Sequence, residues 1–145
     1  MHKHILIVDD QEAIRSSLSE LLYDFCKKNG VETHTASNPK SAFEKIQKLM
    51  KKHKSVIMLI TDLCFEAGKD DGLDLIQIVY KKYGGQRPFI VILTAFLDAE
   101  DGRFKKLRHV VDEILIKPKG ILSVKSIADN FFNCPEMDRL EKILP

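Results

Sequence analysis

The sequence predicts an α/β protein in which one parallel β-sheet is covered by helices on both faces. Four short apolar runs, which begin at Ile5, Val56, Phe89 and Ile114, each end on a polar residue. Continuous apolar runs are typical of parallel strands that are buried on both sides of the sheet. Segments with the apolar period of a helix separate these runs, and alternating strands and helices predict a parallel sheet.

Five strands are expected. The apolar runs place four of them at residues 5–8, 56–61, 89–93 and 114–116. Residues 31–36 alternate apolar and polar side chains, which is typical of a half-exposed strand at the edge of a sheet.

Helices with recognisable ends are expected between the strands. The first covers residues 12–28 and stops at Gly30, because glycine readily adopts the left-handed conformation of a helix C-cap. Asn38 and Pro39 are a typical N-cap and first residue of a second helix. A third helix follows Gly72 and ends before Gly84.

Three further helices are expected in the last third of the chain. One covers residues 98–108, although Gly102 inside it would destabilise it by ~1 kcal/mol relative to Ala. Another includes Val124 to Phe131, and a short one covers 135–144. We therefore expect one domain over residues 1–133 and an appended helix, or the start of a linker, over 134–145.

The composition is that of a globular protein in a reducing compartment. The chain has 145 residues, 44% of them hydrophobic and 30% charged, with a net charge of +2. The three cysteines, Cys26, Cys64 and Cys134, are widely spaced, which favours neither a disulfide framework nor a zinc site. No apolar run approaches the ~18 residues that span a bilayer, and no signal peptide precedes the first strand. We expect a cytoplasmic domain with no direct contact to membrane or nucleic acid.

The polar residues at the strand ends suggest one reactive site. Asp9 and Asp10 follow the first strand, Asp62 follows the third, Thr94 the fourth and Lys117 the fifth. Ligands of open α/β sheets bind outside the carboxyl ends of the strands. Clustered carboxylates repel one another and favour a hard cation such as Mg²⁺. A carboxylate such as Asp62 can then act as a nucleophile toward phosphorus, with Lys117 and Thr94 stabilising the transferred group.

In these motifs the chain resembles the receiver domains of two-component response regulators. The family has an acidic pair after the first strand (here Asp9-Asp10), a phosphoacceptor after the third (Asp62), a hydroxyl after the fourth (Thr94-Ala95) and Lys-Pro after the fifth (Lys117-Pro118). The resemblance extends over about residues 3–133 and implies a flavodoxin-like sheet with strand order 2-1-3-4-5.

The resemblance also implies an activity. Asp62 would take a phosphoryl group from a sensor histidine kinase or a histidine phosphotransfer protein and would switch binding to a downstream protein. Asp10, Asp62 and the backbone carbonyl of Cys64 resemble the direct Mg²⁺ ligands, and Asp9 resembles an indirect ligand that acts through water.

Three features depart from the family's usual pattern. The loop from Asp62 to Gly72 is longer than usual and has no proline. Ile114 stands where the family often has an aromatic switch residue. The bulky Phe96 stands at a position that lines the phosphate pocket, so we expect Phe96 and Cys64 to restrict the approach of water to phosphorylated Asp62.

Two other functions are compatible with the same fold. A pseudo-receiver would bind its partner without phosphate. A phosphatase similar to haloacid-dehalogenase-like hydrolases would need a second Asp two residues after the nucleophile, where this chain has Cys64. We interpret the five histidines as surface or strand-end residues rather than metal ligands; they are His2, His4, His34, His53 and His109. The lysine-rich second helix is interpreted as a solvated face.

Overall fold

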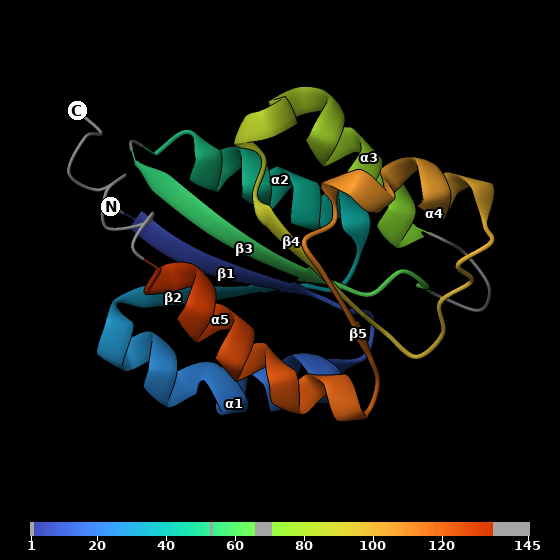
Figure 1. The fold of residues 1–145 in the computed structure, drawn as a ribbon. Helices are drawn as coiled ribbons and strands as arrows, with labels where there is room; N and C mark the ends of the chain where they lie inside the picture. The colour runs from blue at the N-terminus through green and yellow to red at the C-terminus, as the bar shows by residue number, and fades with distance from the viewer. Residues whose placement is uncertain (1, 53, 66–70, 135–145) are drawn as a thin grey trace.

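The computed structural model describes residues 2–52, 54–65 and 71–134. These residues form a five-stranded parallel sheet in the order β2-β1-β3-β4-β5, with helices on both faces (Figure 1). The strands are β1 (His2–Val8), β2 (Val31–Ala36), β3 (Ser55–Thr61), β4 (Phe89–Thr94) and β5 (Glu113–Ile116). The predicted fold class and strand order are confirmed.

Two layers of helices enclose the sheet. Helices α1 and α5 cover one face, and α2, α3 and α4 cover the other (Figure 1). The α-helices are α1 (Glu12–Asn29), α2 (Pro39–Met50), α3 (Asp71–Tyr83), α4 (Gly102–Leu107) and α5 (Val124–Phe132). Short 3-10 turns follow α3 and α4 and precede α5; they are η1 (Gly84–Gln86), η2 (Arg108–Val110) and η3 (Lys119–Ser123).

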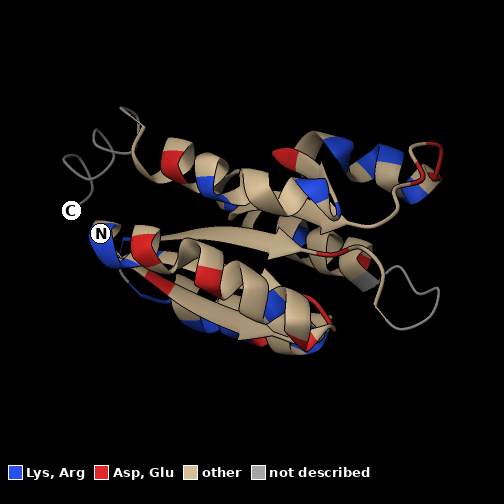
Figure 2. Ribbon diagram, turned by 90° about the horizontal axis from the view of Figure 1, so that it is seen from below, with Lys and Arg blue, Asp and Glu red and all other residues tan. Residues whose placement is uncertain are grey.

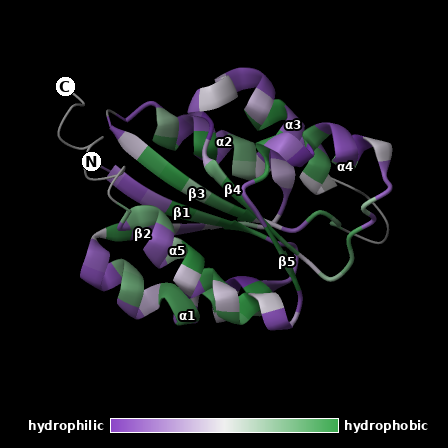
Figure 3. Cartoon of the chain, in the orientation of Figure 1, coloured by the Kyte–Doolittle hydropathy of each residue, from purple (hydrophilic) through white to green (hydrophobic). Residues whose placement is uncertain are grey.

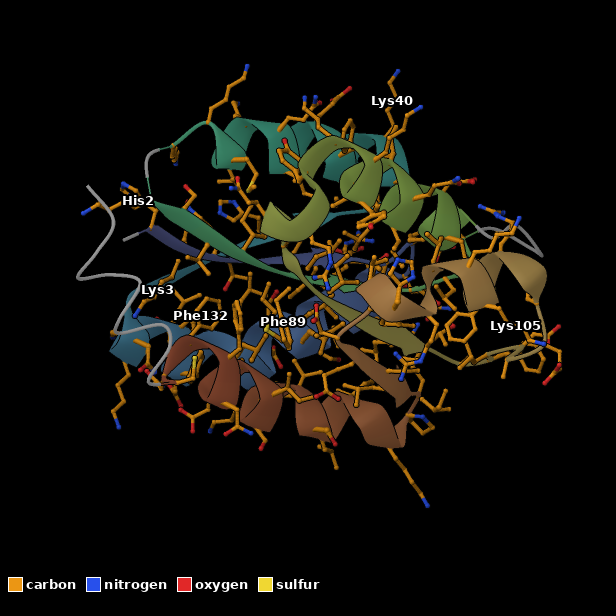
Figure 4. All side chains as sticks on the ribbon, turned by 45° about the horizontal axis from the view of Figure 1, so that its top comes forward. His2, Lys3, Lys40, Phe89, Lys105 and Phe132 are labelled. Atoms are coloured by element: carbon orange, nitrogen blue, oxygen red, sulfur yellow. The ribbon has the colours of Figure 1, made fainter. Side chains whose placement is uncertain are left out.

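The core has two halves because side chains alternate across the sheet. On β1, Leu6 and Val8 pack toward α2 and α3, whereas Ile5 and Ile7 pack toward α1 and α5. Phe132 of α5 is buried between that helix and the sheet (Figure 4). Figure 3 shows the central strands β1 and β3 as mostly hydrophobic beyond the polar start of β1, and Figure 2 shows acidic and basic residues interspersed over the helices.

The predicted capping residues of the first two helices are confirmed. Gly30 has φ 65°, and its backbone N–H donates to the carbonyl of Cys26 at the end of α1. The Asn38 side chain accepts a hydrogen bond from the Ser41 backbone N–H at 2.8 Å. These contacts satisfy backbone groups that a helix end leaves without an internal partner.

The predicted start of the fourth helix at residue 98 is wrong. Helix α4 begins at Gly102, because the Asp101 side chain caps it by accepting hydrogen bonds from the backbone N–H groups of Arg103 and Phe104, at 2.8 and 3.2 Å. Gly102 is therefore the first residue of the helix and not an interior one. The segment from 95 to 101 links the end of β4 to α4.

The predicted helix over residues 135–144 lies outside the described residues, as does most of the polar loop before Gly72. No helix in the described part of the chain is long and apolar enough to cross a membrane.

Candidate functional site

The polar residues predicted to converge lie at the carboxyl ends of four neighbouring strands. Val8 is in register with Thr61, and Thr94 is in register with Ile116. The register continues past the strands, because the Asp62 N–H donates to the Val8 carbonyl at 3.1 Å and the Lys117 N–H donates to the Thr94 carbonyl at 2.8 Å. The parallel sheet itself therefore aligns these residues along one edge.

A buried ion-pair triad forms the centre of the site. The Lys117 Nζ lies 2.8 Å from Oδ2 of Asp9 and 2.8 Å from Oδ2 of Asp62. The side chains are only 11% (Lys117), 3% (Asp9) and 9% (Asp62) exposed, so water screens these charges weakly. One ammonium thus joins residues that are far apart in the sequence and partly cancels the repulsion between the two carboxylates.

Burial and ion pairing oppose each other in setting the pKa values of this triad. Burial alone would lower the pKa of Lys117, but its hydrogen bonds and charge interactions with Asp62 and Asp9 outweigh burial and raise it. For Asp9 the balance is reversed: burial raises the pKa, and the hydrogen bonds from Lys117 and Gln11 offset only part of this. Lys117 is consequently a protonated cation, whereas burial destabilises the ionised form of Asp9.

Backbone donors fix the orientation of the Asp62 carboxylate. Its Oδ1 accepts hydrogen bonds from the backbone N–H groups of Leu63, at 2.7 Å, and Cys64, at 3.3 Å. Its Oδ2 contacts Lys117 instead. The two oxygens therefore have different roles, one anchored by the backbone and the other held against a cation.

Gly72 at the start of α3 packs directly on the backbone of Asp62. A Cβ atom at this position would lie 2.1 Å from the Asp62 carbonyl oxygen and 2.6 Å from the Leu63 Cα. The Gly72 N–H also donates to the Leu63 carbonyl at 3.0 Å. The absence of a side chain at residue 72 is thus what lets α3 approach the end of β3, a role that its place in the sequence did not reveal.

Asp9 and Asp10 are placed differently although they are adjacent. Asp9 is buried, and its Oδ1 accepts a hydrogen bond from the Gln11 N–H at 2.9 Å. Asp10 is exposed in the same loop, so its side chain is not part of the buried triad. Together they offer carboxylate oxygens, the ligand type of hard cations, at one strand end.

The predicted hydroxyl and Phe96 lie at the end of β4, whereas Cys64 follows β3. The buried Thr94 donates a hydrogen bond from its Oγ1 to the Phe96 carbonyl at 3.2 Å. A small cavity of about 170 Å³ adjoins it, lined by Leu63, Cys64, Leu73, Phe96, Leu97, Asp98, Asp101 and Phe104. The side chain of Phe96 is largely exposed at the rim. Thr94 thus connects the end of β4 to the segment that leads into α4.

Comparison with known families agrees with this geometry. The model of the response regulator receiver domain matches residues 5–127, which include all four strand ends of the site. The chain belongs to this family. Receiver domains act in two-component signalling and interact with kinases or phosphotransfer proteins and with downstream targets.

Solved receiver structures have the same fold at low sequence identity. The chemotaxis protein CheY4 of Vibrio cholerae is 22% identical with a TM-score of 0.68, over 90% of this chain and 98% of that one. A CheY-like receiver domain of Methanospirillum hungatei JF-1 is 20% identical with a TM-score of 0.66, over 90% and 97%. The phosphorylated cyanobacterial phytochrome response regulator RcpA is 18% identical with a TM-score of 0.71, over 91% and 95%. No curated protein sequence matches the chain.

Proposed function

We propose that this chain is a phospho-accepting receiver domain. Asp62 takes a phosphoryl group from a histidine kinase or a histidine phosphotransfer protein, with Mg²⁺, and the phosphorylated domain changes its affinity for a downstream protein. The observation that carries the proposal is the buried ammonium of Lys117, 2.8 Å from Oδ2 of Asp62. A carboxylate held against a fixed cation is poised to carry added negative charge.

The transfer step is a direct displacement at phosphorus. An Asp62 carboxylate oxygen forms a bond to phosphorus while the phosphorus–nitrogen bond of the donor phosphohistidine breaks, and the bonding pair returns to the imidazole nitrogen. The Leu63 and Cys64 N–H groups hold Oδ1 of Asp62, and Lys117 neutralises charge that develops on the phosphoryl oxygens. The domain promotes its own phosphorylation and dephosphorylation but is not a stand-alone enzyme.

The charges of the site suit a divalent cation. Asp9 and Asp62 carry two negative charges against the single positive charge of Lys117, and Asp10 adds a further carboxylate at the same strand end. We assign direct Mg²⁺ ligation to Asp10, Asp62 and the Cys64 backbone carbonyl, and contact through water to Asp9. The bound ion would supply the neutralising charge that one lysine cannot.

The proposed switch begins at the Thr94 hydroxyl. Its present hydrogen bond to the Phe96 carbonyl ties β4 to the segment before α4. A hydroxyl that turns toward a phosphoryl group on Asp62 must give up this bond, which releases the segment to a second arrangement. Ile114 is half-buried against the core on the α4 side and has no ring to swing, so the switch is assigned to Thr94 and the segment it holds.

Phosphorylation by a small phosphodonor tests the proposal. The full chain is incubated with phosphoramidate and Mg²⁺, and intact mass is measured for the wild type and for Asp62→Asn. We expect one phosphoryl group on the wild type, stable to acid and labile to base, and none on the variant. Labelling of Asp62→Asn at a normal yield would contradict the assignment of the phosphoacceptor. An unlabelled wild type that still binds its partner would instead favour a phosphate-independent interaction module.

A further inference from the structure

A second cluster of ligand-type side chains lies at the opposite end of the sheet from Asp62. In the parallel pairing of β1 with β2, His4 is in register with Glu32 and Leu6 with His34. Side chains two residues apart on a strand share a face, so Glu32 and His34 lie on the same face, next to His4. Figure 3 shows this hydrophilic start of β1, and Figure 4 labels His2 at the same end.

The interpretation of His4 as a surface or strand-end residue is wrong. The His4 side chain is 1% exposed, because β1 is paired on both sides and α2 packs on it. Its Nδ1 lies 3.1 Å from Nε2 of His34, so the two imidazoles share a hydrogen bond. Its Nε2 has no hydrogen-bond partner within the described residues. Because Nδ1 is the ring nitrogen that faces His34, Nδ1 is the ligand atom that His4 can offer between the two strands.

The spacing of the three side chains matches that of metal ligands. His34 Nε2 is 3.1 Å from His4 Nδ1 and 3.5 Å from Glu32 Oε1, and the ligand atoms all lie within 4.8 Å of one another. Ligands of a tetrahedral ion with bonds of about 2.0–2.1 Å are separated by roughly 3.3 Å. The separations of 3.1 and 3.5 Å therefore lie on either side of the ligand–ligand distance expected for a tetrahedral ion.

The charges around the cluster select the type of metal. Burial is the main cause that lowers the pKa of both imidazoles. Lys52 and Lys45 face the cluster and disfavour a cation, while the Glu32 carboxylate offsets part of their charge. The Lys45 ammonium donates a hydrogen bond to the Thr35 carbonyl, and this contact holds it beside the cluster. Affinity must then come from the imidazole nitrogens, which bind zinc-like transition metals better than Mg²⁺ or Ca²⁺.

We propose that His4, Glu32 and His34 form a binding site for a divalent transition metal of the Zn²⁺, Ni²⁺ or Cu²⁺ type. Glu32 is largely exposed, which gives the ion a route from solvent to the buried ring of His4. The bound metal would join the edge strand β2 to the central strand β1 and would stabilise the folded protein by mass action. Three protein ligands leave a fourth position for water.

Calorimetric titration of the untagged, chelator-treated full chain tests this site. We expect one Zn²⁺ or Ni²⁺ ion per chain and a higher melting temperature with Zn²⁺. Because His4 is buried and its replacement could unfold the protein, the test variants are His34→Ala and Glu32→Gln, each of which should weaken binding by about tenfold or more. The matched control is His109→Ala, an exposed histidine in η2 beside the opposite edge strand β5, which should bind Zn²⁺ as the wild type does.

Cobalt(II) absorption gives a second, independent measurement. A Co²⁺ ion bound by two imidazoles and a carboxylate should give visible bands that Zn²⁺ removes by competition, and His34→Ala should lack them. Unchanged Zn²⁺ affinity in both His34→Ala and Glu32→Gln would overturn the proposal. Loss of binding in His109→Ala alone would overturn it as well, because the ion would then be held elsewhere.

Discussion

Replacement of Gly72 by Ala is expected to disturb the phosphoacceptor without touching any charged group. The added Cβ would lie 2.1 Å from the Asp62 carbonyl oxygen, whereas ordinary contacts of this type begin near 3.4 Å. The backbone of Asp62 or the start of α3 must therefore move by about 1.3 Å. Such overpacking destabilises a protein by about 1–3 kcal/mol, and a 1 Å displacement of a reacting group slows its reaction by about 10²-fold.

The assay compares Gly72→Ala with Gly85→Ala. A Cβ at Gly85 would meet nothing within 4 Å, so this control makes the same chemical change in open space. Urea denaturation measures the free energy of unfolding, and the rate of phosphorylation by phosphoramidate in Mg²⁺ is measured where circular dichroism shows each variant to be folded. A Gly72→Ala protein that is phosphorylated as fast as Gly85→Ala would refute the argument that Gly72 positions Asp62.

Three other changes in the site have expected outcomes. Asp10→Asn should weaken Mg²⁺ binding, measured by titration, because it removes a direct ligand; equal affinity in variant and wild type would exclude Asp10 from the metal site. Burial raises the pKa of Asp9 above its ordinary 3.8, so the folded protein binds the Asp9 proton more tightly than the unfolded chain does. The folded protein therefore loses stability as the pH rises from the unfolded pKa of Asp9 through its folded pKa. Urea denaturation in a chelator should accordingly find Asp9→Asn more stable than the wild type at pH 7, with the difference vanishing toward pH 3. Phe96→Glu should shorten the lifetime of phosphorylated Asp62 by roughly tenfold, ~1.4 kcal/mol in barrier, if Phe96 excludes the attacking water; unchanged decay of the labelled protein would make Phe96 a packing residue.

Most of the fold could be predicted because local signals and tertiary packing agree. The runs that became β3 and β4 are apolar on both faces, and the sheet covers both faces there. The start of α4 could not be predicted, since Asp98 and Asp101 are equally good capping residues in sequence. Asp98 accepts a hydrogen bond from the Glu100 N–H in a local turn, and Asp101 caps the helix. Only the packing of α4 decides between them.

The site could be predicted at the level of which strand ends converge, but not of how the side chains meet. Parallel strands bring Asp9, Asp62 and Lys117 to one edge whatever their rotamers, and so the order of motifs was informative. Two contacts depend on distances across the fold and could not be predicted. One is the bridge from Lys117 to the two carboxylates, and the other is the contact of Gly72 with the Asp62 backbone. His4 was misjudged for a related reason: its burial comes from neighbouring elements and leaves no periodic signal in the sequence.

Strand β1 contains His4 of the metal cluster and leads directly into Asp9 of the phosphoacceptor site, which sets how the two sites can influence each other. His4 and Asp9 are five positions apart, or about 16 Å along an extended strand. Interactions over such a distance are usually additive within about 0.5 kcal/mol. Zn²⁺ binding should therefore change the phosphorylation rate by no more than about twofold unless strand β1 itself shifts. Such a shift would reach the phosphoacceptor through the hydrogen bond from the Asp62 N–H to the Val8 carbonyl.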